Sequence, residues 1–356
     1  MIDLAIIGAG PIGIEAAILA KRAGLTYRVF EKGAVVDAIR RYPISMLFFT
    51  SSERLEVGGH PLVTTTDKAT RKEALDYYRK VVANENLEVM AYTRVVGLAP
   101  TLCPGGSRGF EVHTRPAEGW RLQPHVPDDV VLARYVVVAT GYFDNPKLLG
   151  VPGEDLPHVS HYYDEGHAHY GRNVVIVGGG SSAADAALDL FRAGAKVSMV
   201  HRGDDFRRSL KYWVRPNLEN RIKEGSIDAY FGATVKRVEP AEVVIDQGGA
   251  ELRLPADRVF LLTGYYAPPE LLESAGVRID PGTLAAELTA GTFESNVEGL
   301  FVIGSAGSGS RTADVFIENG LVHAKVALTT IANRIAKQSG ERASAVGEPG
   351  LSAIRG

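Results

Sequence analysis

The feature that most constrains the fold lies in the first fourteen residues. A short apolar run, residues 4–7, leads directly into glycines at positions 8, 10 and 13. Such a run is typical of a strand buried on both faces of a parallel sheet. The G-x-G-x-x-G spacing allows a tight turn at Gly8, close approach of a pyrophosphate at Gly10 and close packing of helix on strand at Gly13. We expect the helix over about residues 14–23, its positive end directed at the phosphates.

An acidic residue follows at the distance that this motif requires. A second predicted strand, residues 27–30, ends at Glu31. An acid about 20 residues past the glycines is the usual acceptor for ribose hydroxyls in a dinucleotide fold. Strand, glycine loop, helix, strand and acid together predict a dinucleotide-binding βαβ unit.

A second copy of this pattern begins at residue 173. The apolar residues 173–177 precede the loop 178–183, which repeats the first motif with Ala183 in the last position. A predicted helix over residues 183–193 and a strand over residues 196–200 complete the unit. Two such units predict an α/β fold with two Rossmann-like nucleotide-binding domains.

The second unit differs from the first in charge. Its second strand ends in His201-Arg202, where the first unit has Glu31. A carboxylate here holds the 2′-hydroxyl of NAD, whereas arginine accommodates the 2′-phosphate of NADP. We therefore expect Arg202, with Arg207 or Arg208, to select NADPH; a solvated basic turn is the alternative. Ser181 and Ser182 are expected to be phosphate-loop donors.

Turn residues divide the chain between the two units. A predicted strand over residues 130–139 ends in Ala-Thr-Gly-Tyr-Phe at 139–143, and prolines and glycines at 146, 150, 152 and 153 follow. A later strand, residues 258–263, leads to Gly264-Tyr265 in the same manner. We expect a discontinuous first domain, residues 1–148 and 267–338, and an inserted second domain, residues 149–266. A helix is predicted over residues 312–337 with an interruption at Gly320, and the polar tail 339–356 is predicted to be disordered.

Composition excludes several classes of function. The chain has 356 residues, 45% of them hydrophobic, and a net charge of −3, which does not favour nucleic acid or a membrane surface. No apolar stretch approaches the roughly 18 residues of a membrane span, and the N-terminal apolar run is interpreted as a core strand and not as a signal peptide, so we expect a cytoplasmic protein. The histidines show no metal-ligand spacing, and no metal site is predicted.

The chain has a single cysteine, Cys103, in the turn-rich segment Cys-Pro-Gly-Gly-Ser. One cysteine can form neither an internal disulfide nor a C-x-x-C redox pair. An incidental loop thiol is therefore the favoured interpretation over a catalytic one.

Taken in order, the motifs resemble the landmarks of the low-molecular-weight thioredoxin reductase-like flavoproteins. The motifs are Gly8-Ala-Gly-Pro-Ile-Gly13, Ala139-Thr-Gly141, Gly178-Gly-Gly-Ser-Ser-Ala183, His201-Arg202 and Gly299-Leu-Phe-Val-Ile-Gly304. Within that group the chain looks most like the YpdA-type bacillithiol disulfide reductases. Three further stretches indicate this subgroup: residues 48–53 (FFTSSE), 151–162 (VPGEDLPHVSHY) and 315–320 (VFIENG). The similarity extends to about Lys337.

The resemblance implies FAD in the first domain and NADPH in the second. Hydride would pass from the nicotinamide to the flavin, and two electrons would then reduce the disulfide of a low-molecular-weight thiol or a similar small acceptor. The family also leads us to expect a homodimer or tetramer. The implied FAD residues are Gly8, Gly10, Pro11, Ile12, Gly13, Glu31, Lys32, Tyr42, Thr140, Gly141, Gly304, Ser305 and Ala313. The implied NADPH residues are Gly178, Gly180, Ser181, Ser182, Ala183, His201, Arg202, Arg207 and Gly264.

The chain departs from the family pattern at three points. Residues 150–265 contain no cysteine, which excludes the internal C-x-x-C relay of thioredoxin reductases. The YpdA-type enzymes usually carry cysteine where this chain has Ile12, and an isoleucine forms no mixed disulfide. A disulfide substrate would then have to meet the flavin directly or receive a thiolate from elsewhere. Ser305 stands where many relatives place an aspartate near the ribityl chain.

Three other functions remain open on the sequence alone. A ferredoxin or flavodoxin reductase of the thioredoxin reductase-like type also lacks the redox cysteines and could use the basic cluster Arg207, Arg208, Lys211 and Arg215 to dock an acidic carrier. A flavin monooxygenase shares the paired loops, but the full FxGxxxHxxxW pattern is absent around His158 and His161. A non-catalytic sensor of the NADPH/NADP ratio is the last alternative.

Overall fold

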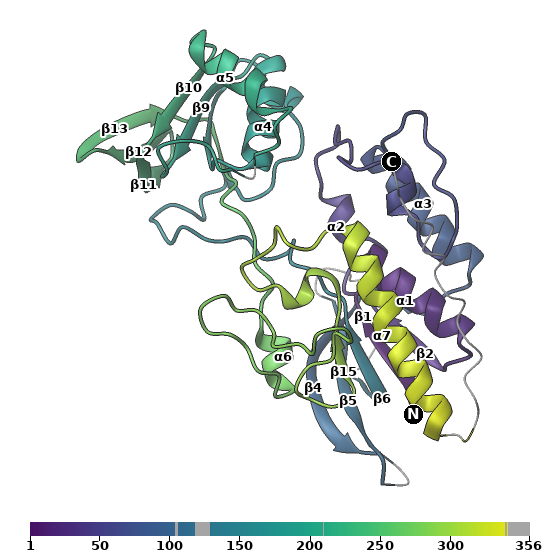
Figure 1. Ribbon diagram of the computed structural model, residues 1–356. Coiled ribbons are helices and arrows are strands. Elements are labelled where there is room, and N and C mark those ends of the chain that lie inside the picture. Colours follow the sequence, from purple (N-terminus) through teal and green to yellow (C-terminus); the bar gives the residue numbers. More distant parts are fainter. Residues whose placement is uncertain (104–105, 118–128, 209, 339, 341–356) are drawn as a thin grey trace. The chain divides into compact units, whose positions relative to one another are not determined.

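The computed structural model describes residues 1–103, 106–117, 129–208, 210–338 and 340 (Figure 1). The chain divides into two compact units. Unit 1 comprises Met1–Arg40, Phe48–Phe143 and Tyr266–Gly356, and unit 2 comprises Arg41–Leu47 and Asp144–Tyr265. The predicted tail 339–356 lies outside the described residues except at Gly340.

Unit 1 is built on a mixed sheet that, in the described residues, has seven strands in the order β3-β2-β1-β6-β5-β4, with β15 also paired to β6. The strands β1, β2, β3, β6 and β15 are parallel, and β4 and β5 form an antiparallel extension. Their bounds are β1 Ile2–Ile7, β2 Tyr27–Phe30, β3 Val89–Met90, β4 Thr93–Leu102, β5 Arg108–Pro116, β6 Asp129–Val138 and β15 Leu300–Val302.

The longest helices of unit 1 pack against one another and against the short turns near the sheet. α1 (Pro11–Arg22) follows the first glycine loop and packs against α7 (Ile317–Gln338) (Figure 1). α7 also contacts the 3-10 turns η1 (Ser52–Leu55) and η3 (Gly304–Gly307). The remaining helices are α2 Asp37–Arg40, α3 Arg71–Asn84 and α6 Glu270–Ser274. α3 begins with a capping box, in which Thr70 accepts from the Glu73 N–H and the Glu73 carboxylate accepts from Thr70.

Unit 2 holds a second parallel sheet, in the order β10-β9-β8-β14-β7, and a separate antiparallel sheet, β11-β12-β13. Its strands are β7 Val159–Ser160, β8 Asn173–Val177, β9 Lys196–His201, β10 Ile227–Phe231, β11 Ala233–Glu239, β12 Glu242–Gln247, β13 Ala250–Pro255 and β14 Arg258–Leu261. Its helical segments are η2 His167–His169, α4 Ser181–Arg192 and α5 Arg215–Lys223. The predicted α/β class with two parallel nucleotide-binding folds is confirmed.

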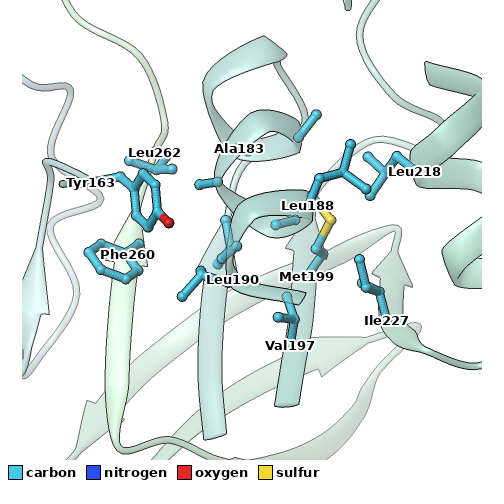
Figure 2. Close-up of a cluster of buried hydrophobic side chains, with 14 of the residues drawn as sticks. Tyr163, Ala183, Leu188, Leu190, Val197, Met199, Leu218, Ile227, Phe260 and Leu262 are labelled. Atoms are coloured by element: carbon cyan, nitrogen blue, oxygen red, sulfur yellow. The ribbon is translucent and has the colours of Figure 1, made fainter. Parts of the chain in front are cut away.

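The parallel sheet of unit 2 is buried on both faces, because alternate residues of a strand point to opposite sides. Val174 and Ile176 of β8 join a core with α4 and α5, shown in Figure 2 around Leu188 and Leu218. Val175 of the same strand joins a different core, against the antiparallel sheet β11-β12-β13. The continuous apolar run at 173–177 is explained by these two cores.

Two sequence expectations differ from the structure in instructive ways. The predicted interruption at Gly320 is wrong, because α7 runs unbroken from Ile317 to Gln338. The segment 41–47 clusters with unit 2, where the Ile44 N–H donates to the Asp164 carbonyl at 2.9 Å and Arg41 pairs with Asp144. Among the described residues, no helix is both long enough and apolar enough to cross a bilayer.

Candidate functional site

The first glycine loop joins β1 to α1 in unit 1. Gly8 has a φ of +106°, and a Cβ added to it would lie 2.5 Å from the Ala139 carbonyl oxygen. A Cβ on Gly13 would lie 2.0 Å from the Gly8 oxygen, whereas a Cβ on Gly10 would meet no described atom within 4 Å. Packing therefore requires glycine at positions 8 and 13, and position 10 leaves space where a pyrophosphate is expected.

Both loop helices begin without a side-chain cap, in contrast to α3. The N-cap residues are Gly10 for α1 and Gly180 for α4, and neither helix has an acid in its first turn or, in the described chain, a side-chain hydrogen bond at its cap. The first N–H groups of a helix need partners, and the helix dipole favours a negative one. Two uncapped starts beside open glycines fit the phosphates of two nucleotides.

Glu31 is fixed against the first loop by two backbone amides. Its carboxylate accepts from the Ala9 N–H and from the Gly33 N–H, each at 2.8 Å. The side chain is buried, and this burial raises the pKa of Glu31, partly offset by the two hydrogen bonds. A carboxylate offers about four lone-pair sites, so acceptor capacity remains for ribose hydroxyls. The residues present thus fit the adenosine half of a flavin dinucleotide.

The structure brings some of the other implied FAD residues together and leaves others apart. A Cβ on Gly141 would lie 3.9 Å from the Ser305 hydroxyl oxygen, so the turn after β6 meets η3. Thr140, Lys32 and Ala313 are exposed, and Pro11 starts α1. Tyr42 falls in the 41–47 segment of unit 2, not in unit 1.

Ile12 is wedged between two glycines. Its Cδ1 atom lies 2.6 Å from the place of a Cβ on Gly304 and 2.3 Å from that of a Cβ on Gly320. Gly320 is therefore a packing glycine inside α7, which explains why the helix does not break there. The Ile12 side chain of the first loop therefore packs against η3 and α7.

The second glycine loop joins β8 to α4 in unit 2. A Cβ on Gly178 would lie 2.5 Å from the Leu262 carbonyl oxygen, so this glycine is also required by packing. A Cβ on Gly180 would have only the Arg207 Cδ nearby, at 3.9 Å. The Ser181 hydroxyl accepts from the Lys211 N–H at 3.4 Å, and Ser182 is exposed. Gly180 thus faces open space beside a cationic side chain.

The end of β9 supplies positive charge next to this loop. The His201 ring lies against the backbone of the loop, 2.6 Å from the place of a Cβ on Gly179. Burial, followed by the nearby Arg207 and Arg202, lowers the pKa of His201. The imidazole is then neutral at pH 7 and packs against the loop, and the positive charge beside it is that of the two arginines.

One cation of this neighbourhood, Lys147, was not predicted from the sequence. Its backbone pairs with the turn after β14: the Lys147 N–H donates to Gly264 at 2.9 Å and its carbonyl accepts from the Thr263 hydroxyl at 2.6 Å. Burial, followed by Arg207 and Arg202, lowers the pKa of Lys147. Its position in a proline-rich connection gave no motif signal. Gly264 itself, with a φ of +103°, has no described atom within 4 Å of an added Cβ.

The single cysteine lies away from both loops in the chain and is buried. Cys103 follows β4, its N–H donates to Ser107 at 2.7 Å, and its sulfur lies against Gly109 of β5. No group of three or more histidine, cysteine or acidic side chains gathers as a metal site in the part of the chain that the structure describes.

Comparison with known proteins adds a family to this geometry. The family model described as pyridine nucleotide-disulphide oxidoreductase matches residues 5–304. The chain is 39% identical over 330 residues to bacilliredoxin reductase Bdr of Bacillus subtilis (strain 168), covering 92% of this chain and 97% of that protein. It is 28% identical over 316 residues to a ferredoxin–NADP reductase of Ignicoccus hospitalis, covering 85% of this chain and 90% of the relative.

A solved structure agrees with the first of these relatives. The bacillithiol disulfide reductase Bdr (YpdA) from Bacillus cereus superposes with a TM-score of 0.88 at 38% identity, covering 94% of this chain and 99% of that chain. The likeness therefore extends over both glycine loops and both units, and is not confined to one nucleotide-binding fold.

Proposed function

Because the chain belongs to the pyridine nucleotide-disulphide oxidoreductase family, we propose that it is an NADPH-dependent FAD oxidoreductase that reduces the disulfide of a low-molecular-weight thiol. The observation that carries this proposal is the pair of glycine loops with opposite charge beside them. The Glu31 carboxylate lies beside the first loop, and the Arg202 and Arg207 side chains lie beside the second. One chain then distinguishes a nucleotide that offers ribose hydroxyls from one that offers a 2′-phosphate.

The two units divide the cofactors in this proposal. Unit 1 holds FAD, with Gly10 open to its pyrophosphate and Glu31 on its ribose. Unit 2 holds NADPH, with Gly180 open to its pyrophosphate and Arg202 on its 2′-phosphate. When bound, the two cofactors supply hydride and electron transfer, and the residues of this chain bind them and orient them.

The disulfide substrate is proposed from the names of the relatives. The Bacillus subtilis protein is named for bacilliredoxin and the Bacillus cereus structure for bacillithiol disulfide. We propose bacillithiol disulfide or a related small disulfide as the acceptor. We also propose that the protein is a homo-oligomer, which light scattering on the purified protein tests.

The test is stopped-flow reduction of the flavoprotein by NADPH, followed by reoxidation with a panel of acceptors. Heat release of the cofactor and chromatography should first identify FAD. We expect bacillithiol disulfide to reoxidise the enzyme faster than cystine, quinone or oxygen. Reduction by NADH in preference to NADPH would contradict the arginine assignment. Oxygenated product, or no turnover with any acceptor above the oxidase background, would select the monooxygenase or the sensor.

A second candidate, ferredoxin–NADP reduction, is favoured by a specific observation. The only cysteine of the chain is buried Cys103, and position 12 of the first loop carries a packed isoleucine. No thiol of the first loop is available to form a mixed disulfide with a substrate. Reoxidation by ferredoxin combined with no reaction of any disulfide would replace the first proposal by this one.

A further inference from the structure

The backbone of unit 2 places Lys147 beside the second glycine loop. The Leu262 N–H donates to Val177 at 2.8 Å, and its carbonyl lies directly against Gly178. The chain that continues from Leu262 to Gly264 is the segment whose Thr263 and Gly264 hydrogen-bond to Lys147. Lys147 is thus tied to the strand that borders the loop.

The charges around this point repel one another. The Arg207 N–H donates to the Gly179 carbonyl at 3.0 Å, and its Cδ atom lies 3.9 Å from the place of a Cβ on Gly180. Lys147 interacts electrostatically with both Arg207 and Arg202, and all three carry positive charge. Like charges that are partly removed from water raise one another's free energy, which a bound anion offsets.

The strand order decides which part of a nucleotide lies near Lys147. In the sheet, β8 lies between β9 and β14. Arg202 follows β9, the flank at which this fold reads the 2′ position of the ribose. Lys147 pairs with the turn after β14, on the other flank of the loop, and the glycines between them mark the approach of the pyrophosphate.

We propose that Lys147 binds the pyrophosphate of the nicotinamide dinucleotide, as a third cation of the second loop with a role separate from that of Arg202. This proposal rests on the proposed use of a dinucleotide by unit 2. It assigns tightness of binding for both NADPH and NADH to Lys147, and the choice between them to Arg202.

The test measures binding of two probes to the flavin-loaded protein by titration calorimetry. ADP-ribose carries a pyrophosphate but no 2′-phosphate, and 2′-AMP carries a 2′-phosphate but no pyrophosphate. Lys147→Met should weaken ADP-ribose about tenfold, the loss of one charge-assisted hydrogen bond, and change 2′-AMP by less than about twofold. Arg202→Met should give the reverse pattern. The KM values for NADPH and NADH should rise by the same factor in Lys147→Met.

Matched controls separate charge at this site from charge in general. Lys196→Met removes a lysine at the exposed start of β9 and should leave both probes unchanged. Lys147→Arg keeps the charge and should stay within about threefold of the wild type. Should Lys147→Met lose stability, Lys147→Gln must reproduce its pattern.

Each alternative result overturns a different statement. Unchanged ADP-ribose binding in Lys147→Met, or a loss confined to NADPH and 2′-AMP, overturns the assignment of Lys147 to the pyrophosphate. Failure of the wild-type protein to bind either probe overturns the proposed function itself. These two failures are distinguishable because the second appears before any variant is made.

Discussion

The two glycine loops share the same pattern of backbone hydrogen bonds but differ in the side chains beside them. In each, the first glycine donates to the end of the second strand, Gly8 to Phe30 at 2.8 Å and Gly178 to Val200 at 3.0 Å. In each, the middle residue accepts from the segment that follows that strand: Ala9 from Val36, and Gly179 from Arg207, both at 3.0 Å. The equivalent hydrogen bonds align the two loops position by position.

This alignment isolates the positions at which the loops differ. Glu31 corresponds to His201, Lys32 to Arg202, and buried Val36 to Arg207. The backbone turn is thus equivalent in the two units, and the second unit replaces a carboxylate by an imidazole and a buried valine by an arginine. We therefore expect the proposed nucleotide choice to depend on the side chains that follow the second strand and not on the loop backbone.

The largest expected effect comes from giving the first loop the side chain that the second already has. A Cβ at position 13 would lie 2.0 Å from Gly8, whereas Ala183 is accommodated in the second loop. Gly13→Ala should reduce bound flavin to below about a tenth and cost about 1–3 kcal/mol of unfolding free energy. Flavin absorbance per protein and thermal unfolding measure both. Ala183→Gly should keep its flavin, and full flavin retention in Gly13→Ala would show that close packing does not define the first loop.

The second effect is on nucleotide choice. Arg202→Ala removes a cation from the end of β9 and should raise the KM for NADPH about 10- to 100-fold, the range for a hydrogen bond to a charged group, with little change for NADH. Stopped-flow flavin reduction with each nucleotide measures the ratio. FAD content should stay at the wild-type level, since the first loop is untouched. An equal loss for both nucleotides would argue against a 2′-phosphate role.

The third effect concerns the acid of the first loop. Glu31→Gln keeps the shape, but an amide nitrogen accepts no hydrogen bond, so the Ala9 or the Gly33 N–H loses its partner. We expect about tenfold weaker FAD binding to the apoprotein, measured by fluorescence titration, because an unsatisfied buried donor costs about 1–3 kcal/mol. NADPH affinity is the internal control, and a variant with normal FAD affinity would remove Glu31 from the site.

The smallest expected effect is on stability. It concerns a further difference between the loops, at position 12 of the first and the equivalent position 182 of the second. Ile12 is wedged against Gly320, while Ser182 is exposed. Gly320→Ala should destabilise the protein by about 1 kcal/mol, despite the higher helix propensity of alanine, because its Cβ meets the Ile12 Cδ1.

Ile12→Val removes that Cδ1 atom, so the double variant should recover the loss of Gly320→Ala. A coupling of about 1 kcal/mol in urea unfolding is expected from the double-mutant cycle. Additive effects of the two substitutions would mean that the two side chains do not compete for space.

The sequence predicted the parts of the fold that rest on local pattern. The strand at 173–177 was predicted at its observed bounds, since an apolar run between a turn and a glycine loop has few alternatives. α1 begins at Pro11, three residues before its predicted start, because proline suits the first helical turn. Both glycine loops and their flanking strands were evident for the same reason.

The features that sequence pattern missed depend on residues far apart in the chain. Gly320 was predicted to interrupt a helix on propensity alone, and its packing against Ile12 decides otherwise. The three-stranded sheet β11-β12-β13 escaped prediction because its alternation is irregular: β11 has a register shift between Val235 and Arg237, and β12 carries three consecutive apolar residues, 243–245. Lys147 is held by hydrogen bonds with Thr263 and Gly264, which lie far from it in the sequence.

The solitary buried thiol has a practical consequence. Since Cys103 is the only cysteine and its sulfur is buried against Gly109, we expect the native chain to react very little with maleimides and other thiol reagents. A cysteine placed on the surface of each unit would accept a fluorophore pair without background. Energy transfer between the two dyes would then report, in solution and during turnover, how the distance between the units responds to each nucleotide.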